Sequence, residues 1–273
     1  MRQTADRLNA PGNQELADIL GSVVVERKPL HGWPLSQVEE IRTETQRYVL
    51  KSQLSCASVE RAFYEQIRHP MLMTPCAGAS LGNWDYLILP YAGGGTEDWS
   101  GLCDDQIRLR VQQLRQQLSL PGNAPVFFDF STFEKWMAAW QSVGHVLSAG
   151  GFLELEFEAV TKWLESCGST CWDTPVSVLH GDLKGENILR DEQGNLFVID
   201  WQRPLMAPLA LEECIALLLA GRDGNSYDPF AVLARMYLSY WYAWAYQTCL
   251  PVSFVQGTAV KYARTALEYM NQR

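Results

Sequence analysis

The sequence predicts an α+β protein with two unequal lobes, a small antiparallel β lobe over residues 1–92 and a larger, mainly helical lobe over residues 93–273. The first third of the chain alternates short runs of β-branched and aromatic residues with turn residues, which is typical of antiparallel strands. Three consecutive glycines, residues 93–95, then mark a change in composition. Beyond them apolar residues recur every three or four positions, which is the spacing of amphipathic helices.

In the first lobe, β-branched and aromatic residues predict strands at Ser22–Glu26 and Arg47–Lys51, with a turn between them at His31–Pro34. Helical spacing predicts a helix over Ser58–Arg68, and its first residue is suited to cap the helix start. The run Tyr86–Pro90 predicts a buried strand that ends at a proline, because proline cannot donate to a sheet ladder.

In the second lobe, the same helical spacing predicts helices over Asp105–Leu118, Phe133–Leu147, Phe152–Cys167, Leu209–Ala220, Pro229–Gln247 and Thr258–Met270. The stretch Val176–Asp200 interrupts these helices with runs of β type. Its residues Asp191–Gly194 read as a turn, so the end of this stretch is predicted to form a hairpin.

Composition and charge exclude several classes of protein. The 273 residues are 47% apolar and 19% charged, which excludes a disordered or fibrous chain, and a net charge of −9 disfavours nucleic acid as a partner. The opening Met1–Leu20 lacks the apolar core of a signal peptide, and the seven cysteines show no paired pattern, so we expect reduced thiols and a cytoplasmic location. No stretch approaches the ~18 consecutive apolar residues of a membrane span, so we expect no membrane association.

The segment with the most specific chemistry is Val178–Leu189, which reads Val-Leu-His-Gly-Asp-Leu-Lys-Gly-Glu-Asn-Ile-Leu, followed by the Phe-Val-Ile-Asp-Trp of residues 197–201. Phosphoryl transfer from a nucleotide needs a group that orients the acceptor hydroxyl, and it needs hard oxygen ligands for magnesium. Asp182 suits the first task, and Asn187 and Asp200 suit the second. One loop followed by one hairpin could present all three side chains to a single site.

The run His180–Asn187, with Ile-Asp-Trp at 199–201, resembles the catalytic loop and metal-binding motif of the aminoglycoside phosphotransferase and choline kinase superfamily, which is related to protein kinases. The resemblance is close in this segment and extends more loosely over nearly the whole chain. It implies a two-lobed protein-kinase-like fold that binds ATP and Mg²⁺ between its lobes. It also implies that Asp182 is the catalytic base and that Asn187 and Asp200 are the magnesium ligands. Lys184, which could neutralise charge on the transferring phosphoryl group, departs from the usual loop of this superfamily and is closer to that of protein kinases.

The same resemblance implies nucleotide contacts in the first lobe. Lys51 resembles the strand lysine that contacts the α- and β-phosphates, and Glu60 on the following helix is its expected carboxylate partner, with Glu65 as the alternative. In the segment that resembles the phosphate-covering loop, Gly32 and Ser36 are the candidate contacts.

The resemblance further identifies a hinge and a support for the catalytic loop. Leu89 would line the adenine pocket, and a purine of ATP or GTP would bind the backbone carbonyl of Pro90 and the backbone N–H of Ala92. Glu212 or Glu213, at the start of a later helix, stands about where relatives carry an aspartate that buttresses the catalytic loop.

The sequence leaves the acceptor open. Glu154, Glu156 and Glu158, together with the net charge, favour a cationic acceptor such as an aminoglycoside or an amino alcohol, although such an alternation is also typical of a solvated face. Aromatic residues on one predicted helix could cage a quaternary ammonium or form core; they are Tyr237, Tyr240, Trp241 and Trp244.

Taken as a whole, the sequence predicts an ATP- and Mg²⁺-dependent kinase that transfers the γ-phosphate to a hydroxyl group of a small molecule. A protein serine/threonine kinase is the nearest alternative, suggested by Lys184 and opposed by Gly181, where those enzymes usually carry arginine. A nucleotide-binding pseudokinase scaffold is the alternative from another class. The oligomeric state stays open.

Overall fold

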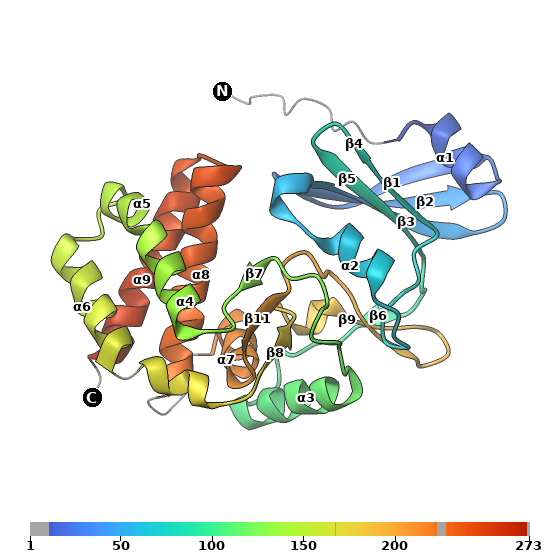
Figure 1. The fold of residues 1–273 in the computed structure, drawn as a ribbon. Coiled ribbons are helices and arrows are strands. Elements are labelled where there is room, and N and C mark those ends of the chain that lie inside the picture. Colours follow the sequence, from blue (N-terminus) through green and yellow to red (C-terminus); the bar gives the residue numbers. More distant parts are fainter. Residues whose placement is uncertain (1–10, 167, 223–227, 272–273) are drawn as a thin grey trace. The chain divides into compact units, whose positions relative to one another are not determined.

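The computed structural model describes residues 11–166, 168–222 and 228–271. The chain divides into two compact units (Figure 1). The first extends to Thr96 and also includes Leu189–Gln202, and the second comprises Glu97–Ile188 and the chain from Arg203 onward.

The first unit is built on a five-stranded antiparallel sheet in the order β1-β2-β3-β5-β4. Its strands are β1 (Val24–Trp33), β2 (Ser36–Thr43), β3 (Arg47–Leu54), β4 (Ala77–Leu81) and β5 (Trp84–Pro90). The first unit also contains two α-helices, α1 (Asn13–Leu20) and α2 (Glu60–Gln66), and the short 3₁₀-helix η1 (Ser55–Ala57). Leu16 of α1 packs onto the sheet in a core that also contains Ile41, Tyr48, Leu50 and Ile88.

The strands predicted around residues 22–26, 47–51 and 86–90 are confirmed, and so is the helix predicted over Ser58–Arg68. The turn predicted at His31–Pro34 lies later than expected, at residues 34–35, because β1 continues to Trp33 and pairs there with Ser36 at the start of β2. The prediction also missed β2 and β4. The sequence of β2 is rich in charged residues, and β4 (Ala-Gly-Ala-Ser-Leu) contains no β-branched residue, so neither carries the usual strand signal.

A second sheet of the order β10-β9-β6 contains β6 (Gly95–Thr96), β9 (Ile188–Arg190) and β10 (Leu196–Val198). The predicted hairpin is confirmed, and the Asp191 carboxylate closes its turn by accepting the backbone N–H groups of Gln193 and Asn195 at 2.9 and 2.7 Å. Gly94 before β6 passes so close to this hairpin that an added Cβ would lie 1.6 Å from the Arg190 carbonyl oxygen. Gly94 is therefore required for close packing of the backbone at this point.

The hairpin and the residues after it belong to the first unit, whereas the order of the chain predicts that they belong to a lobe that begins at residue 93. The Trp201 ring stacks on the Phe63 ring of α2 with centroids 4.4 Å apart. The backbone N–H of Val198 donates to the Met71 carbonyl, and that of Val59 donates to the Gln202 carbonyl. These contacts join segments that are far apart in the sequence, which chain order alone does not indicate.

The second unit is mainly helical (Figure 1). Its α-helices are α3 (Asp104–Gln117), α4 (Phe133–Ser142), α5 (Gly144–Ala149), α6 (Glu154–Ser166), α7 (Ala210–Leu219), α8 (Pro229–Thr248) and α9 (Ser253–Met270), and a 3₁₀-helix η2 spans Gly168–Asp173. The six predicted helices are confirmed, except that the one over Phe133–Leu147 divides at Val143 into α4 and α5. Cys167, the predicted end of another helix, lies outside the described residues.

Helix α8 is largely buried and packs against α7 and α9. It begins where the Asp228 side chain accepts the Phe230 N–H at 2.9 Å and Pro229 occupies the first turn, both of which favour a helix start. Over the described ranges, no helix is both long enough and apolar enough to cross a membrane.

A three-stranded sheet in this unit brings three distant segments to one end. It contains β7 (Phe128–Asp129), β8 (Val176–Leu179) and β11 (Leu205–Pro208), and β11 lies between the other two. Leu205 pairs with Phe128 in the parallel ladder and with Leu179 in the antiparallel ladder. The residues just before β7, just before β11 and just after β8 therefore lie together. The prediction found β8 but missed β7 and β11, which have only two and four residues.

Candidate active site

Lys51 lies between two carboxylates in the first unit. Its Nζ is 2.7 Å from a carboxylate oxygen of Glu60 and also donates a hydrogen bond to Asp200. Gln53, two residues further along β3, donates to the same Glu60 carboxylate. The side chains of Lys51 and Glu60 are only 9% and 2% exposed, so this is a buried ion pair. Glu65, the alternative partner, instead pairs with Arg61 at 2.8 Å.

The pKa values of Lys51 and Glu60 depend on their burial and on the presence of two carboxylates beside one ammonium group. Burial disfavours the charged form of Lys51, but Asp200 and Glu60 outweigh this effect and raise the pKa of Lys51 above its ordinary value. Burial also raises the pKa of Glu60, against the opposing effect of the Lys51 ammonium. The Lys51 ammonium is thus the ion-pair partner of both the Glu60 and the Asp200 carboxylates.

Asp200 has an unusual backbone conformation. Its φ is 72°, and no other residue except glycine has a positive φ in the described part of the chain. Such a conformation is disfavoured for a residue with a Cβ, although aspartate tolerates it better than most, and it is enriched at functional sites. Trp201 holds the segment in place through its stacking on Phe63 and through its indole N–H, which donates to the Val198 carbonyl at 3.0 Å.

The other candidate nucleotide contacts also lie in the first unit. Gly32 and Ser36 flank the tip of the β1–β2 hairpin, and Gly32 has open space on the side where a Cβ would be. Leu89 is buried, Pro90 ends β5, and Ala92 follows it half-buried. Their contacts with a nucleotide stay predictions.

In the second unit, the loop after β8 holds Asp182. The Asn187 side-chain amide, from the 3₁₀-helix η3 (Gly185–Asn187), donates to the Asp182 backbone carbonyl at 2.8 Å. The Asp182 N–H donates to His180 Nδ1 at 3.3 Å. Lys184 pairs with the exposed Glu186 at 3.2 Å. The loop therefore fixes its own shape through side-chain to backbone hydrogen bonds.

Glu212, near the start of α7, holds this loop through hydrogen bonds to its backbone. Its carboxylate accepts the backbone N–H groups of His180 at 2.6 Å and Gly181 at 3.1 Å, and the residue is 2% exposed. Burial raises the pKa of Glu212 to about 7, although the two hydrogen bonds oppose this shift. Glu213, the alternative candidate, instead lies 3.2 Å from Arg115. The geometry therefore assigns the contact with the loop to Glu212.

Gly181 is required for the same loop. Its φ is 78°, and an added Cβ would lie 2.5 Å from the Leu205 side chain and 2.8 Å from the Arg203 carbonyl oxygen. Only glycine fits such a conformation in this space.

Arg203 contacts Asp182, and the sequence pattern does not indicate this contact. Its guanidinium lies 3.6 Å from an Asp182 carboxylate oxygen and 4.1 Å from the centroid of the Trp241 ring. It stands three positions after Asp200, and a cation so close to a metal-ligand motif was the only available signal. Its stacking partner lies on α8, far along the chain.

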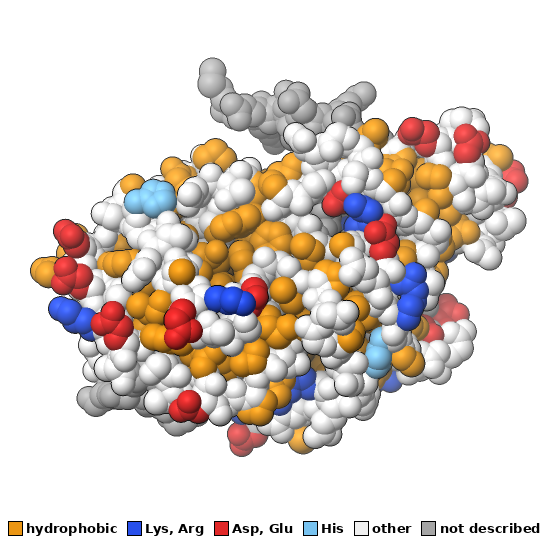
Figure 2. All heavy atoms as spheres, viewed as in Figure 1, with side chains coloured by type: hydrophobic (Ala, Val, Ile, Leu, Met, Phe, Trp, Pro, Cys, Tyr) orange, Lys and Arg blue, Asp and Glu red, His pale blue; other side chains and the backbone are white. Residues whose placement is uncertain are grey.

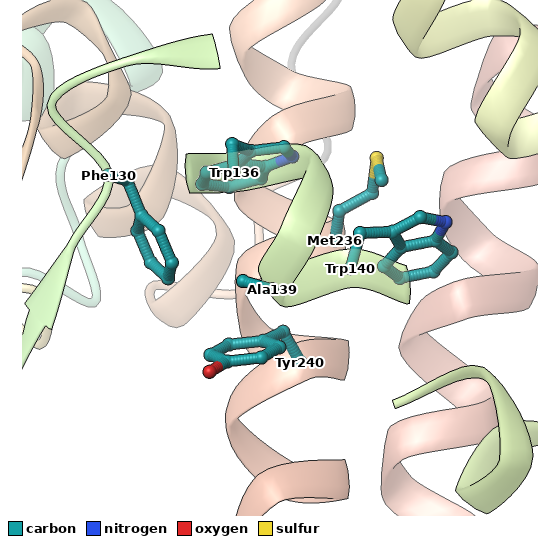
Figure 3. Close-up of a pocket in the computed structure, with 6 residues that line it drawn as sticks. All are labelled: Phe130, Trp136, Ala139, Trp140, Met236 and Tyr240. Atoms are coloured by element: carbon teal, nitrogen blue, oxygen red, sulfur yellow. The ribbon is translucent and has the colours of Figure 1, made fainter. Parts of the chain in front are cut away.

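A separate cavity of about 10 Å³ lies between α4 and α8, lined by Phe130, Trp136, Ala139, Trp140, Met236 and Tyr240 (Figure 3). This volume holds roughly one water molecule, so the cavity is a packing gap between aromatic side chains.

The predicted magnesium ligands lie in different units, Asn187 in the second and Asp200 in the first, and their role stays a prediction. No cluster of three or more His, Cys, Asp or Glu side chains able to hold a metal exists within residues 11–166, 168–222 and 228–271. Asn187 and Asp200 nevertheless offer oxygen donors, which Mg²⁺ prefers, and a metal shared with nucleotide phosphates needs only one or two protein ligands. Because the Asn187 Nδ2 donates to Asp182, its Oδ1 faces the opposite way and can bind a cation.

Comparisons with known proteins agree with this fold. Residues 36–248 match the phosphotransferase enzyme family. Choline kinase LicA from Streptococcus pneumoniae has a TM-score of 0.64 at 13% identity, over 94% of this chain and 97% of that chain. A Plasmodium vivax ethanolamine kinase has a TM-score of 0.61 at 12% identity, over 89% and 81%. Aminoglycoside phosphotransferase APH(4)-Ia has a TM-score of 0.58 at 18% identity, over 94% and 97%. No curated protein sequence matches the chain.

The α+β fold is that of the kinase-like enzymes, and the chain is a phosphotransferase with an alcohol group as acceptor. It belongs to the phosphotransferase enzyme family, whose match covers most of its length.

Proposed function

We propose that the protein is a cytoplasmic small-molecule kinase that uses ATP and Mg²⁺ to phosphorylate a hydroxyl group. The observation that carries this proposal is the buried Lys51, held by Glu60 and Asp200. Burying an ion pair costs free energy that the pair itself rarely recovers, so such a group is better explained by function than by stability. A buried ammonium aimed by one carboxylate is suited to bind phosphate oxygens.

The roles of the residues follow from their chemistry. Lys51 binds the α- and β-phosphates, and Gly32 and Ser36 contact the phosphates from the β1–β2 hairpin. The purine, of ATP or alternatively GTP, binds the Pro90 carbonyl and the Ala92 N–H beside Leu89. Asn187 and Asp200 would hold the magnesium ion, which would supply positive charge to the phosphate oxygens.

In the transfer itself, the Asp182 carboxylate orients the acceptor hydroxyl and accepts its proton as the acceptor oxygen bonds to the γ-phosphorus. The bond between that phosphorus and the β–γ bridging oxygen breaks, and ADP leaves. Arg203 holds the Asp182 carboxylate in place through its contact at 3.6 Å. Lys184 neutralises charge on the transferring group, in exchange for its contact with Glu186.

The cationic acceptor that the sequence favoured finds less support in the second unit. Two of the carboxylates that suggested it are paired, Glu156 with Arg264 at 4.0 Å and Glu158 with Lys162 at 3.6 Å. Tyr237 and Trp241 are buried, and Arg203 covers a face of the Trp241 ring. Spectinomycin and hygromycin B are bound by two of the similar enzymes, so both compounds belong in any acceptor screen.

The test is Asp182→Ala. We expect this change to lower the turnover of ATP by about 10²–10⁴-fold, the usual contribution of a general base, while the affinity for ATP stays nearly unchanged. Turnover is measured with excess acceptor, and affinity by calorimetry. Asp18→Asn, at an exposed carboxylate of α1, is the matched control and should behave as the wild type. Equal turnover in Asp182→Ala and the wild type would reject the assignment.

A further inference from the structure

Aromatic side chains lie beside the candidate base in the second unit. Phe127, Tyr240, Trp241 and Trp244 form what we call the aromatic shelf. The Phe127 ring centroid is 5.0 Å from that of Trp244 and 6.0 Å from that of Trp241, and Trp241 stacks on Trp244 at 5.4 Å. Tyr240 joins the shelf through Phe128, with centroids 5.0 Å apart. Phe127, Tyr240 and Trp244 are half-buried, so part of the shelf is accessible.

The shelf is connected to Asp182 by the small sheet and by Arg203. The Phe127 N–H donates to the Pro204 carbonyl at 2.6 Å, which places the shelf next to the residue that follows Arg203. Arg203 stacks on Trp241 at 4.1 Å and reaches Asp182 at 3.6 Å. A molecule lying on the shelf would thus have its edge toward Asp182. Figure 2 shows hydrophobic side chains gathered on the face over α4, β7 and α8.

The charges around the shelf are already matched. The three carboxylates in β7, β8, β11 and the loop after β8 each have a cation as partner. Asp129 pairs with Lys135 at 2.5 Å, Asp182 with Arg203 at 3.6 Å, and Glu186 with Lys184 at 3.2 Å. The hydrogen bond from Lys135 lowers the pKa of Asp129 to about 2, so this carboxylate is fully ionised and engaged. No excess of negative charge remains in these segments to attract a polycation.

Arg203 also works against a cationic acceptor. Its guanidinium lies where an ammonium group would otherwise meet Asp182 and the Trp241 ring, and two like charges at that distance repel. An uncharged ring, in contrast, stacks on aromatic side chains at no electrostatic cost. Discrimination by such a repulsive element is a common source of specificity.

On this basis, and resting on the kinase function proposed above, we propose that the acceptor is an uncharged, hydroxylated molecule whose flat apolar ring lies on the aromatic shelf. Its hydroxyl group points toward Asp182, and cationic amino alcohols and aminoglycosides are disfavoured. The shelf therefore determines which class of alcohol the enzyme phosphorylates.

The test compares matched acceptors in the full chain. Phenyl β-glucoside carries an uncharged ring, methyl β-glucoside lacks that ring, and 4-(aminomethyl)phenyl β-glucoside adds a positive charge. Choline and hygromycin B complete the cationic arm. Binding is measured by calorimetry in the presence of a non-hydrolysable ATP analogue, and phosphorylation by ADP release. We expect the phenyl compound to bind about tenfold more tightly than either glucoside partner, the gain that ring stacking of ordinary strength provides.

Variants separate the shelf from general effects on structure. Trp244→Ala should weaken binding of the phenyl compound about tenfold and leave binding of the methyl compound unchanged. Phe254→Ala, at an exposed aromatic residue of α9 outside the shelf, is the matched control and should change neither. Arg203→Met should reduce the preference for the uncharged over the aminomethyl compound, a ratio that a loss of stability alone would not change.

Tighter binding of the cationic compounds, or no binding of the phenyl compound, overturns the proposal. Turnover of ATP that depends on Asp182 would in either case leave the kinase function standing. Loss of that dependence would instead reject the kinase function.

Discussion

At the scale of single residues, the burial of Lys51 and its carboxylate partners in the first unit costs electrostatic free energy. The Lys51 ammonium is shared between Glu60 and Asp200, and removing it would leave Glu60 buried without a cation. We expect Lys51→Met to lower the free energy of unfolding by about 3 kcal/mol, as is usual when one partner of a buried pair is removed. The measurement is urea denaturation at pH 7. The double variant Lys51→Met/Glu60→Gln should recover part of the loss, and equal midpoints for the wild type and both variants would contradict the buried pair.

Glu212 predicts a dependence of stability on pH. Its pKa of about 7 in the folded protein lies above the ordinary value of 4.5, so the folded state holds a proton that the unfolded state releases between these values. The stability that this group contributes is therefore complete below about pH 4.5 and is lost as the pH rises through 7. Glu212→Gln cannot titrate, so the Tm of the wild type should fall relative to that of the variant between pH 4.5 and 8.

Glu158→Gln, at an exposed carboxylate of α6, is the control for this experiment. A constant difference in Tm between the wild type and Glu212→Gln across this range would show that the carboxylate keeps its ordinary titration.

Candidate residues whose chemistry is encoded locally can be singled out from the sequence, and their roles stay predictions. Asp182, Asn187 and Asp200 stand at short, fixed spacings, so a pattern of residue types was enough to single them out. Arg203 could not be predicted in the same way, because its contact with Asp182 depends on the ring of Trp241, which α8 brings from far along the chain. The choice between Glu60 and Glu65, and between Glu212 and Glu213, likewise depended on side-chain direction, which sequence spacing leaves open.

At the scale of secondary structure, α9 contains a residue that lowers its stability. Gly257 is exposed within this helix, and an added Cβ would meet no atom within 4 Å. Because glycine is less favourable than alanine in a helix interior, we expect Gly257→Ala to raise the free energy of unfolding by about 1 kcal/mol. Thermal denaturation checks the gain, and turnover of ATP should stay unchanged. Gly181→Ala is the opposite case, and a stable, active Gly181→Ala protein would contradict the loop geometry.

The helices could be predicted with more certainty than the strands. Helical periodicity extends over three or more turns in α3, α6 and α8, so the signal repeats. The strands β7 and β11 have two and four residues, too few to show an alternating pattern. Their existence depends on pairing with distant partners, and this pairing is what brings Phe127, Arg203 and Asp182 to one end of the sheet.

At the scale of the whole molecule, ligand binding should stabilise the chain. If ATP and Mg²⁺ bind the folded protein alone, a concentration of 100 times the dissociation constant stabilises it by about 2.7 kcal/mol. We expect Tm to rise with ATP plus Mg²⁺, to rise less with ATP plus a chelator, and to stay constant for Lys51→Met with both. An equal rise in Lys51→Met would contradict the role of Lys51 in binding phosphates.

The fold class could be predicted from the change in residue periodicity along the chain, and the family from the loop and hairpin over residues 178–201. The division into units could not. The sequence places a boundary at residues 92 and 93, but the chain leaves the first unit after Thr96 and returns to it for Leu189–Gln202. Contacts such as Phe63 with Trp201 decide this membership, and they join residues more than a hundred positions apart.

Because Leu189–Gln202 belongs to the first unit, that unit cannot be obtained as a single continuous fragment of the chain. A fragment that stops at Thr96 would lack Trp201 and would expose the Phe63 ring, and it would deprive Lys51 of the Asp200 carboxylate. Neither half of a single cleavage would then carry a complete hydrophobic interior. Autonomous expression requires a spliced gene in which the hairpin is rejoined to the amino-terminal portion, so truncation libraries should be designed around two junctions, not one.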